Sequence, residues 1–259
     1  MAQELRNVAG VCVEWLERGS GPPVLFLDPG IGVAPDAPVL DRLAAKARVI
    51  VVSHPGFGRS EQPKDMTNVD DLAYFHLDLM DELRLDGVTL IGVSFGGWVA
   101  SEIAIKSTAR IARLVLADAL GIKIGARDER DIADIFAMSE ADFLTHAYAN
   151  PEAGRRDYKS MAEADLVPIA RNREALARYG WQPYMHDPKL KQRLHRIRVP
   201  TLVLWGEADR IVLPSYGHGY AAAIPGARFE TIPRAGHFPH LEAPDAFASR
   251  VQAFMETAP

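Results

Sequence analysis

The sequence has a single cysteine, no long apolar run and no excess of positive charge, and each of these features limits the class of protein to which it can belong. Cys12 is the single cysteine among 259 residues, so an internal disulfide is excluded and a reducing compartment is compatible with the sequence. There is no run of about 18 apolar residues, as a membrane-spanning helix requires, and no basic, apolar leader at the N-terminus. An excess of positive charge is also missing, since the net charge is -5. We therefore expect a soluble, cytoplasmic protein with neither a membrane nor a nucleic acid as its partner.

What the chain does contain is an alternation of short apolar runs and helix-compatible segments. Hydrophobic residues make up 48% of the composition, enough for one large core. A strand followed by a helix, repeated at short intervals, is typical of an α/β protein with a mostly parallel, doubly wound sheet. The first of these strands, with turn residues after it, is expected at an edge of the sheet. The expected strands in the first half of the chain are 11–17, 24–27, 49–52, 88–93 and 114–117.

The alternation stops after residue 120 and resumes near residue 197. Between them, residues 121–196 contain no convincing apolar strand, and helices are expected over 127–138, 140–148, 162–178 and 189–194. A segment this long is not an ordinary connection. We expect residues 121–196 to form a helical cap and residues 1–120 and 197–259 to form the core. The alternative is a set of helices packed on the sheet.

The stretch at residues 92–96, Gly-Val-Ser-Phe-Gly, fits the pattern G-x-S-x-G. It follows a buried-strand pattern and precedes a helix-compatible run, which is the context that gives this motif its meaning. Such a sharp turn needs residues without a Cβ at Gly92 and Gly96. It would hold the Ser94 hydroxyl at the carboxyl end of a strand. The alternative is a glycine-bounded turn with an incidental serine.

Serine is a weak nucleophile and needs a general base that a third group orients. Asp209 follows an expected strand at 201–205, and His237 follows another at 228–232. Loops at the carboxyl ends of parallel strands meet at one edge of the sheet. Alone, Asp209 could form a turn or cap a helix, and His237 could be structural. Together, in the order serine, acid, histidine, the three residues predict a catalytic triad.

The chain resembles the α/β-hydrolases along nearly all of its length. Residues 204–212 resemble the acid loop of that family, 234–244 its histidine loop, and 55–60 the loop after its fourth strand. The resemblance implies the α/β-hydrolase fold, with a helical cap inserted after the sixth strand. It also implies that Ser94 is the nucleophile, that His237 is general base and then general acid, and that Asp209 orients His237. Asp118 is a rival for the acid role, because some members place the acid there. Neither a cofactor nor a metal is expected.

An acyl-transfer site also needs donors for the oxyanion. The amide of Phe95 is the first candidate. The second should come from the loop after residues 24–27, where the family usually has His-Gly and this chain has Asp28-Pro29-Gly30-Ile31. We assign the Ile31 amide, with the register open by one residue. Asp28 should either stabilise this loop through backbone amides or contact a polar part of the substrate.

The substrate pocket is expected to include Gly30, Trp98, Trp181 and Tyr184, although Trp98 could equally belong to the core. The predicted function is hydrolysis of an ester-like, small-molecule carbonyl compound through an acyl-enzyme, with a carboxylesterase as first choice. A C–C bond hydrolase of ring-cleavage products is the nearest alternative, although that group tends to have Asn where this chain has Val93. A lactonase is a third alternative. A ligand-binding receptor or pseudo-enzyme is an alternative of another class. A homodimer is left open.

Overall fold

The computed structural model describes residues 3–126 and 128–257. Eight strands form one sheet in the order β1-β2-β4-β3-β5-β6-β7-β8, and β3 to β8 are parallel to one another. This confirms a mostly parallel sheet. The strands are β1 (Glu4–Val8), β2 (Val11–Arg18), β3 (Pro23–Leu27), β4 (Arg48–Val52), β5 (Val88–Val93), β6 (Ile111–Ala117), β7 (Thr201–Gly206) and β8 (Arg228–Ile232).

The first strand of the sheet was not predicted from the sequence. β1 pairs with β2 in an antiparallel hairpin, and β2 pairs on its other side with β4. The expectation that residues 11–17 form an edge strand is therefore wrong, because β1 covers that edge. β1 is mostly exposed and polar, so it lacks the apolar pattern that reveals a strand in a sequence.

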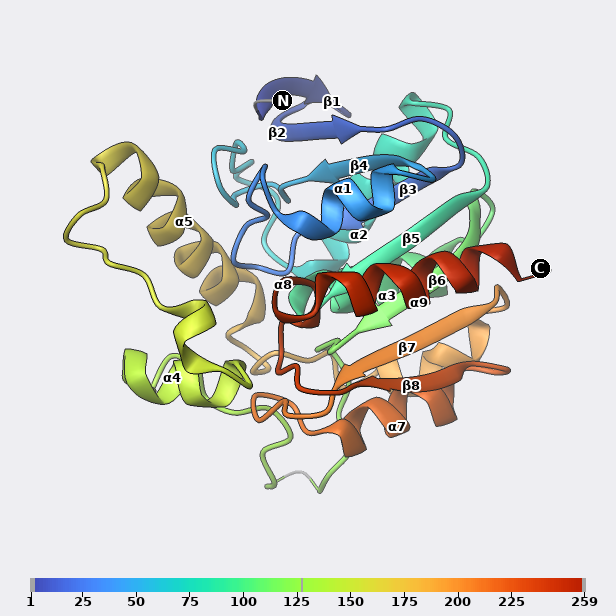
Figure 1. Cartoon of the computed structure of the whole chain (residues 1–259). Helices are drawn as coiled ribbons and strands as arrows, with labels where there is room; N and C mark the ends of the chain where they lie inside the picture. The colour runs from blue at the N-terminus through green and yellow to red at the C-terminus, as the bar shows by residue number, and fades with distance from the viewer. Residues whose placement is uncertain (1–2, 127, 258–259) are drawn as a thin grey trace.

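Helices cover both faces of the sheet, which confirms a doubly wound architecture (Figure 1). α1 and α9 contribute to the apolar cluster on one face, and α2, α3 and α7 contribute to the cluster on the other. The α-helices are α1 (Pro38–Ala44), α2 (Val69–Glu82), α3 (Phe95–Lys106), α4 (Glu140–Ala147), α5 (Glu163–Gly180), α6 (Leu190–Arg193), α7 (Pro214–Ala223), α8 (Pro239–Glu242) and α9 (Pro244–Glu256). In the described residues, no helix has the length and apolar character that crossing a membrane demands.

The central strands are fully buried, as their sequences predict. All six residues of β5 and all six of β7 are buried, because helices cover both faces of a parallel sheet. The loops that follow β3, β5, β6, β7 and β8 all leave from the carboxyl edge of the parallel strands. Residues distant in sequence are thereby brought to one edge of the sheet.

Between β6 and β7 the chain leaves the sheet and forms α4, a short 3₁₀ helix (η1, Pro151–Gly154) and α5, which lie at the left of Figure 1 beyond the two helical layers. It then returns through α6 and a second 3₁₀ helix (η2, Leu194–Arg196), with α6 against α3. The helices expected over 140–148, 162–178 and 189–194 are confirmed, with small differences at their ends.

The helix expected over 127–138 is wrong for residues 128–138; Arg127 lies outside the described residues. This stretch is a loop, and carboxylates hold it. Asp131 accepts hydrogen bonds from the amides of Ile124 and Gly125 and from the Lys123 ammonium. Ile132 forms an isolated β-bridge with Val212. Acidic side chains that bond to nearby backbone amides compete with a helix.

Candidate active site

Ser94 lies at the turn between β5 and α3, in a backbone conformation that non-glycine residues rarely adopt. Its φ is 52° and its ψ is -118°. The close approach around it explains the two flanking glycines. A Cβ on Gly92 would lie 2.3 Å from the carbonyl oxygen of Gly96, and a Cβ on Gly96 would lie 2.6 Å from that of Asp28. The Ser94 amide donates to the Ala117 carbonyl oxygen, which helps fix this strained turn.

His237 reaches Ser94 from the loop after β8. Its Nε2 lies 2.7 Å from the Ser94 Oγ, and both side chains are buried. The backbone amide of His237 donates to the carbonyl oxygen of Ala147, at the end of α4. Glu242 adds a second tie between these segments, since its carboxylate accepts from the amides of Gly236, Ala149 and Asn150. Glu242 was not predicted from the sequence.

Asp209 completes a chain of hydrogen bonds. Its Oδ2 lies 2.8 Å from the His237 Nδ1, and its Oδ1 accepts from the amides of Ile211 and Val212. An ionised carboxylate only accepts, so Nδ1 carries the proton and Nε2 is free to accept the hydroxyl proton of Ser94. The three predicted residues thus form a triad-like arrangement.

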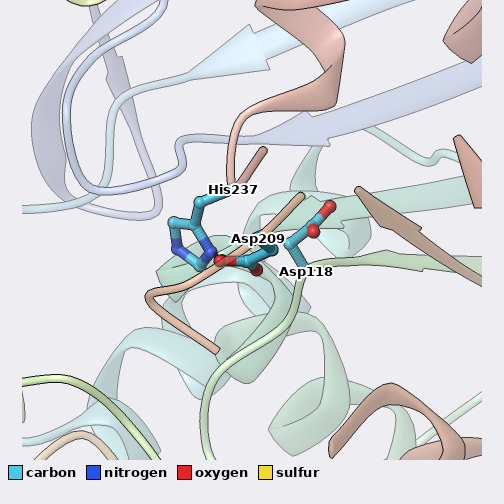
Figure 2. A group of neighbouring side chains, drawn as sticks. All are labelled: Asp118, Asp209 and His237. Carbon is cyan, nitrogen blue, oxygen red and sulfur yellow. Dashed lines mark hydrogen bonds and ion pairs between the residues drawn. The ribbon is translucent and has the colours of Figure 1, made fainter. Parts of the chain in front are cut away.

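Asp118 lies on the far side of Asp209 from His237 (Figure 2). One of its oxygens accepts from the Gly206 amide at 2.8 Å, and the other has no partner among the described residues. Burial and then the neighbouring charge of Asp209 raise the pKa of Asp118 well above its ordinary value. It is Asp209, and not Asp118, that accepts the hydrogen bond from the His237 Nδ1.

Three potential metal ligands lie close together in this site. One atom each of Asp118, Asp209 and His237 lies within 4.8 Å of the others, close enough for a metal ion. The His237 Nδ1 and the Asp209 Oδ2, however, already face each other at hydrogen-bond distance. The hydrogen bonds from the His237 Nδ1 to Asp209 and from the Gly206 amide to Asp118 therefore account for this cluster.

The loop after β3 contains an amide without a hydrogen-bond partner among the described residues, that of Ile31, which lines the cavity beside Ser94. Asp28 is fully buried, and its Oδ1 accepts from the amides of Gly30 at 2.7 Å and Gly32 at 3.0 Å. The amide of Ile31, between them, donates no hydrogen bond within residues 3–126 and 128–257, and nor does the Phe95 amide at the start of α3. Burial raises the pKa of Asp28 to about 6 against the opposing effect of these two amides.

Two buried histidines, one bonded to the other, stabilise the loop after β3. The His54 Nε2 lies 3.0 Å from the carbonyl oxygen of Asp28, and its Nδ1 lies 2.7 Å from the His76 Nε2. Burial lowers the pKa of His54 to about 4 and that of His76 well below its ordinary value, so both rings are neutral at physiological pH. The loop that carries Ile31 is therefore fixed both by the Asp28 side chain and by the His54 ring.

A small cavity of about 30 Å³ lies directly beside Ser94 and His237. Ile31 and Tyr184 line it, and the Tyr184 hydroxyl is fixed by the backbone of Ala133 and Ile135. A second, larger cleft of about 540 Å³ adjoins this cavity. The two share four lining residues, which are Ile31, Ile135, Phe143 and Leu176.

The predicted pocket residues lie in different places. Tyr184 lines the cavity beside Ser94, and Gly30 lines the larger cleft. Trp181 is 59% exposed and lines a separate hollow with Tyr184, and Trp98 is buried against Phe95. The apolar residues of α4 and α5 that line the cleft were not predicted, because a helix facing a cleft shows the same periodicity as one facing a core.

Comparison with known proteins gives relatives that include two hydrolases and a polyketide synthase. Over 96% of its length the chain is 25% identical to the 2-hydroxy-6-oxo-6-(2'-aminophenyl)hexa-2,4-dienoic acid hydrolase of Metapseudomonas resinovorans, of which it covers 89%. Over 93% of its length it is 27% identical to the pimeloyl-[acyl-carrier protein] methyl ester esterase of Pectobacterium carotovorum, of which it covers 98%. It is also 29% identical to the polyketide synthase ThaQ of Burkholderia thailandensis, but it spans only 13% of that protein.

Among solved structures, the chain is similar to a mutant form of the meta-cleavage product hydrolase CumD. The TM-score is 0.80 and the identity 20%, and the alignment covers 98% of each chain. This likeness confirms the fold. Residues 24–250 match the model of the Alpha/beta hydrolase family. The chain therefore belongs to the alpha/beta hydrolase family.

Proposed function

We propose that the protein is a serine hydrolase that cleaves a carboxylic ester through an acyl-enzyme formed on Ser94. The observation that carries this proposal is the continuous hydrogen-bond chain from Ser94 through His237 to Asp209, with distances of 2.7 and 2.8 Å. His237 takes the hydroxyl proton as Ser94 attacks the carbonyl carbon, and then gives it to the departing alkoxide. Asp209 holds the ring in the required tautomer and stabilises its charged form. A water molecule activated by His237 then releases the acid.

The amides of Phe95 and Ile31 would stabilise the tetrahedral oxyanion. They are free of other hydrogen bonds in the part of the chain that the structure describes. Ile31 lines the cavity that also contains the Ser94 side chain. Donors of this kind act strongly because they are oriented before the charge develops.

Residues 121–196 would serve as a cap over this site, with residues 1–120 and 197–259 as the core. Phe143 and Leu176, from α4 and α5, line the cavity beside Ser94, and Met185 does so from the segment after α5. An enclosed apolar site excludes water and strengthens the interactions within it. The arrangement suits a small-molecule substrate.

A second candidate is hydrolysis of a C–C bond in a ring-cleavage product. It is supported by the similarity to the dienoic acid hydrolase of Metapseudomonas resinovorans along nearly the whole chain. The similarity to a methyl ester esterase supports the first candidate. Lactone hydrolysis would use the same groups on a cyclic ester.

A panel of substrates tests these proposals. Wild type and Ser94→Ala are assayed with p-nitrophenyl butyrate, an aliphatic lactone and a vinylogous diketone. We expect the wild type to act most efficiently on the butyrate and the variant to lose that activity. A preference for the diketone would assign the C–C hydrolase instead. Binding without turnover would indicate a receptor, and equal turnover by the two proteins would refute the role of Ser94.

A further inference from the structure

The cleft behind the catalytic cavity is large compared with the space beside Ser94. Its volume is about 540 Å³, within the range of about 300–1,000 Å³ typical of small-molecule sites, against about 30 Å³ for the cavity. Most of its walls are apolar side chains from α4, α5 and the loop before α4. Since Ile31, Ile135, Phe143 and Leu176 line both spaces, a substrate bound at Ser94 would extend past them into this cleft.

Asn172 places unpaired donors in the wall of this cleft. Its side chain is on α5 and the residue is only 5% exposed. The Oδ1 accepts from the Gly58 amide at 2.6 Å, which sets the orientation of the side-chain amide. The Nδ2 then points away from Gly58 and donates no hydrogen bond among the described residues.

The Asn172 Nδ2 lies close to the backbone of Gly32. A Cβ on Gly32 would lie 3.0 Å from the Nδ2 of Asn172, so the absence of a side chain there leaves the nitrogen uncovered. Gly32 follows Ile31 directly, and its amide is held by Asp28. Asn172 therefore offers its donors close to the proposed oxyanion loop. The nitrogen keeps some accessible surface, since it is not one of the fully buried side-chain polar atoms without a partner, and an oxygen acceptor on a ligand can therefore take the place of water there.

The other polar residues of the cleft are two arginines, which only donate, one carboxylate, and three residues with hydroxyl groups that can donate or accept, which are Ser139, Tyr148 and Tyr158. Arg156 and Arg173 line it, and the Arg173 guanidinium lies 5.4 Å from the centre of the Phe136 ring. Glu140 is the one carboxylate among the lining residues that the structure describes. Donors in an apolar cleft favour a ligand that is apolar for most of its length and carries an oxygen acceptor.

We propose that this cleft binds the acyl group of the substrate, and that Asn172 binds an oxygen acceptor, such as a keto oxygen, on that acyl chain. The substrate class is an ester of an oxo-substituted aliphatic acid. This inference rests on the proposed esterase function. A site built to bond an oxygen discriminates strongly against the analogue that lacks it, because the donors are then left unpaired.

The test uses matched pairs of esters. p-Nitrophenyl levulinate and its next two longer homologues are each compared with the unsubstituted acyl ester of equal length. For at least one length, we expect the wild type to have a kcat/KM about tenfold or more higher for the oxo ester. Asn172→Asp keeps an oxygen for the Gly58 amide and removes the N–H donors. In this variant the ratio of oxo to unsubstituted kcat/KM should fall by about tenfold.

The control is Arg178→Gln, on the exposed side of the same helix, where Arg178 pairs with Glu174. This variant should keep the wild-type ratio. Titration of Ser94 with a fluorophosphonate gives the concentration of folded sites in every preparation. The inference is overturned if the ratio is the same in wild type and Asn172→Asp. Failure of the proposed function would look different, because Ser94→Ala would then match the wild type on the unsubstituted esters.

Discussion

Asp209 and Asp118 lie next to each other in one buried site, and it is Asp209 whose carboxylate accepts the hydrogen bond from the His237 Nδ1, at 2.8 Å. Asp209 is further held by two backbone amides, from Ile211 and Val212. Asp118 accepts from the Gly206 amide through one oxygen. Two carboxyl groups this close cannot both ionise easily, and burial together with the charge of Asp209 raises the pKa of Asp118.

This relationship predicts different outcomes for two isosteric variants. Asp209→Asn should lower kcat for an ester by about 10³- to 10⁴-fold, because the amide favours the wrong tautomer of His237. Asp118→Asn should retain activity within about tenfold, since Asp118 makes no hydrogen bond to His237 and its raised pKa favours the neutral form that Asn mimics. Steady-state kinetics of both purified variants measures this. A large loss in Asp118→Asn together with a small loss in Asp209→Asn would transfer the acid role to Asp118.

The loop after β3 gives a second prediction. In Asp28→Ala the amides of Gly30 and Gly32 lose their acceptor, so the Ile31 amide is no longer fixed in direction. We expect kcat to fall by about 10- to 100-fold while KM changes little, since removing one oxyanion donor lowers kcat by about 10²- to 10³-fold and a misplaced donor loses part of that effect. Asp28→Asn keeps an oxygen for both amides and should restore most of kcat. Equal losses in the two variants would show that Asp28 does not act through the loop.

The raised pKa of Asp28 leads to a third prediction, that the stability of the protein depends on pH. Burial raises its pKa from 3.8 to about 6, so the folded protein binds more protons than the unfolded chain between these values. Its carboxylate therefore destabilises the fold as pH rises through this interval, by about 3 kcal/mol above it. Asn does not titrate. Urea unfolding should show that the stability of Asp28→Asn relative to wild type increases between about pH 4 and about pH 6 and is constant at higher pH. A relative stability that does not vary with pH would contradict this.

The sequence was sufficient to predict the parts of the fold that have a strong local pattern. The fully buried strands β5 and β7 appear as continuous apolar runs, and the turn at Ser94 is defined by glycines that the close backbone contacts require. β1 was missed because its residues are mostly polar and exposed. The helix expected over 127–138 failed because the Asp131 carboxylate bonds to backbone amides and holds a loop instead.

The candidate catalytic residues could be predicted from their order in the chain and from their positions in loops that follow strands. Ser94, Asp209 and His237 each follow a parallel strand, so their convergence follows from topology. The cleft could not be predicted, because the polar group in its wall is an ordinary asparagine on a helix with many exposed charges. Only the packing of α5 over Gly32 and Gly58 shows that Asn172 is buried, that its Nδ2 lies close to Gly32 and that the residue lines the cleft. Glu242 could not be predicted either, because the amides of Ala149 and Asn150 that it bonds are distant from it in the sequence.

The central claim is that Ser94 is a nucleophile activated by His237, and covalent labelling tests it most directly. The protein is incubated with a fluorophosphonate, and intact mass and peptide mapping locate the adduct, with Ser94→Ala as the matched control. We predict one adduct per chain, on Ser94, with loss of ester turnover in proportion to labelling. Ser94→Ala should show neither the adduct nor the turnover. An unlabelled Ser94 in a protein that still hydrolyses the ester, or wild-type turnover by Ser94→Ala, would contradict the account.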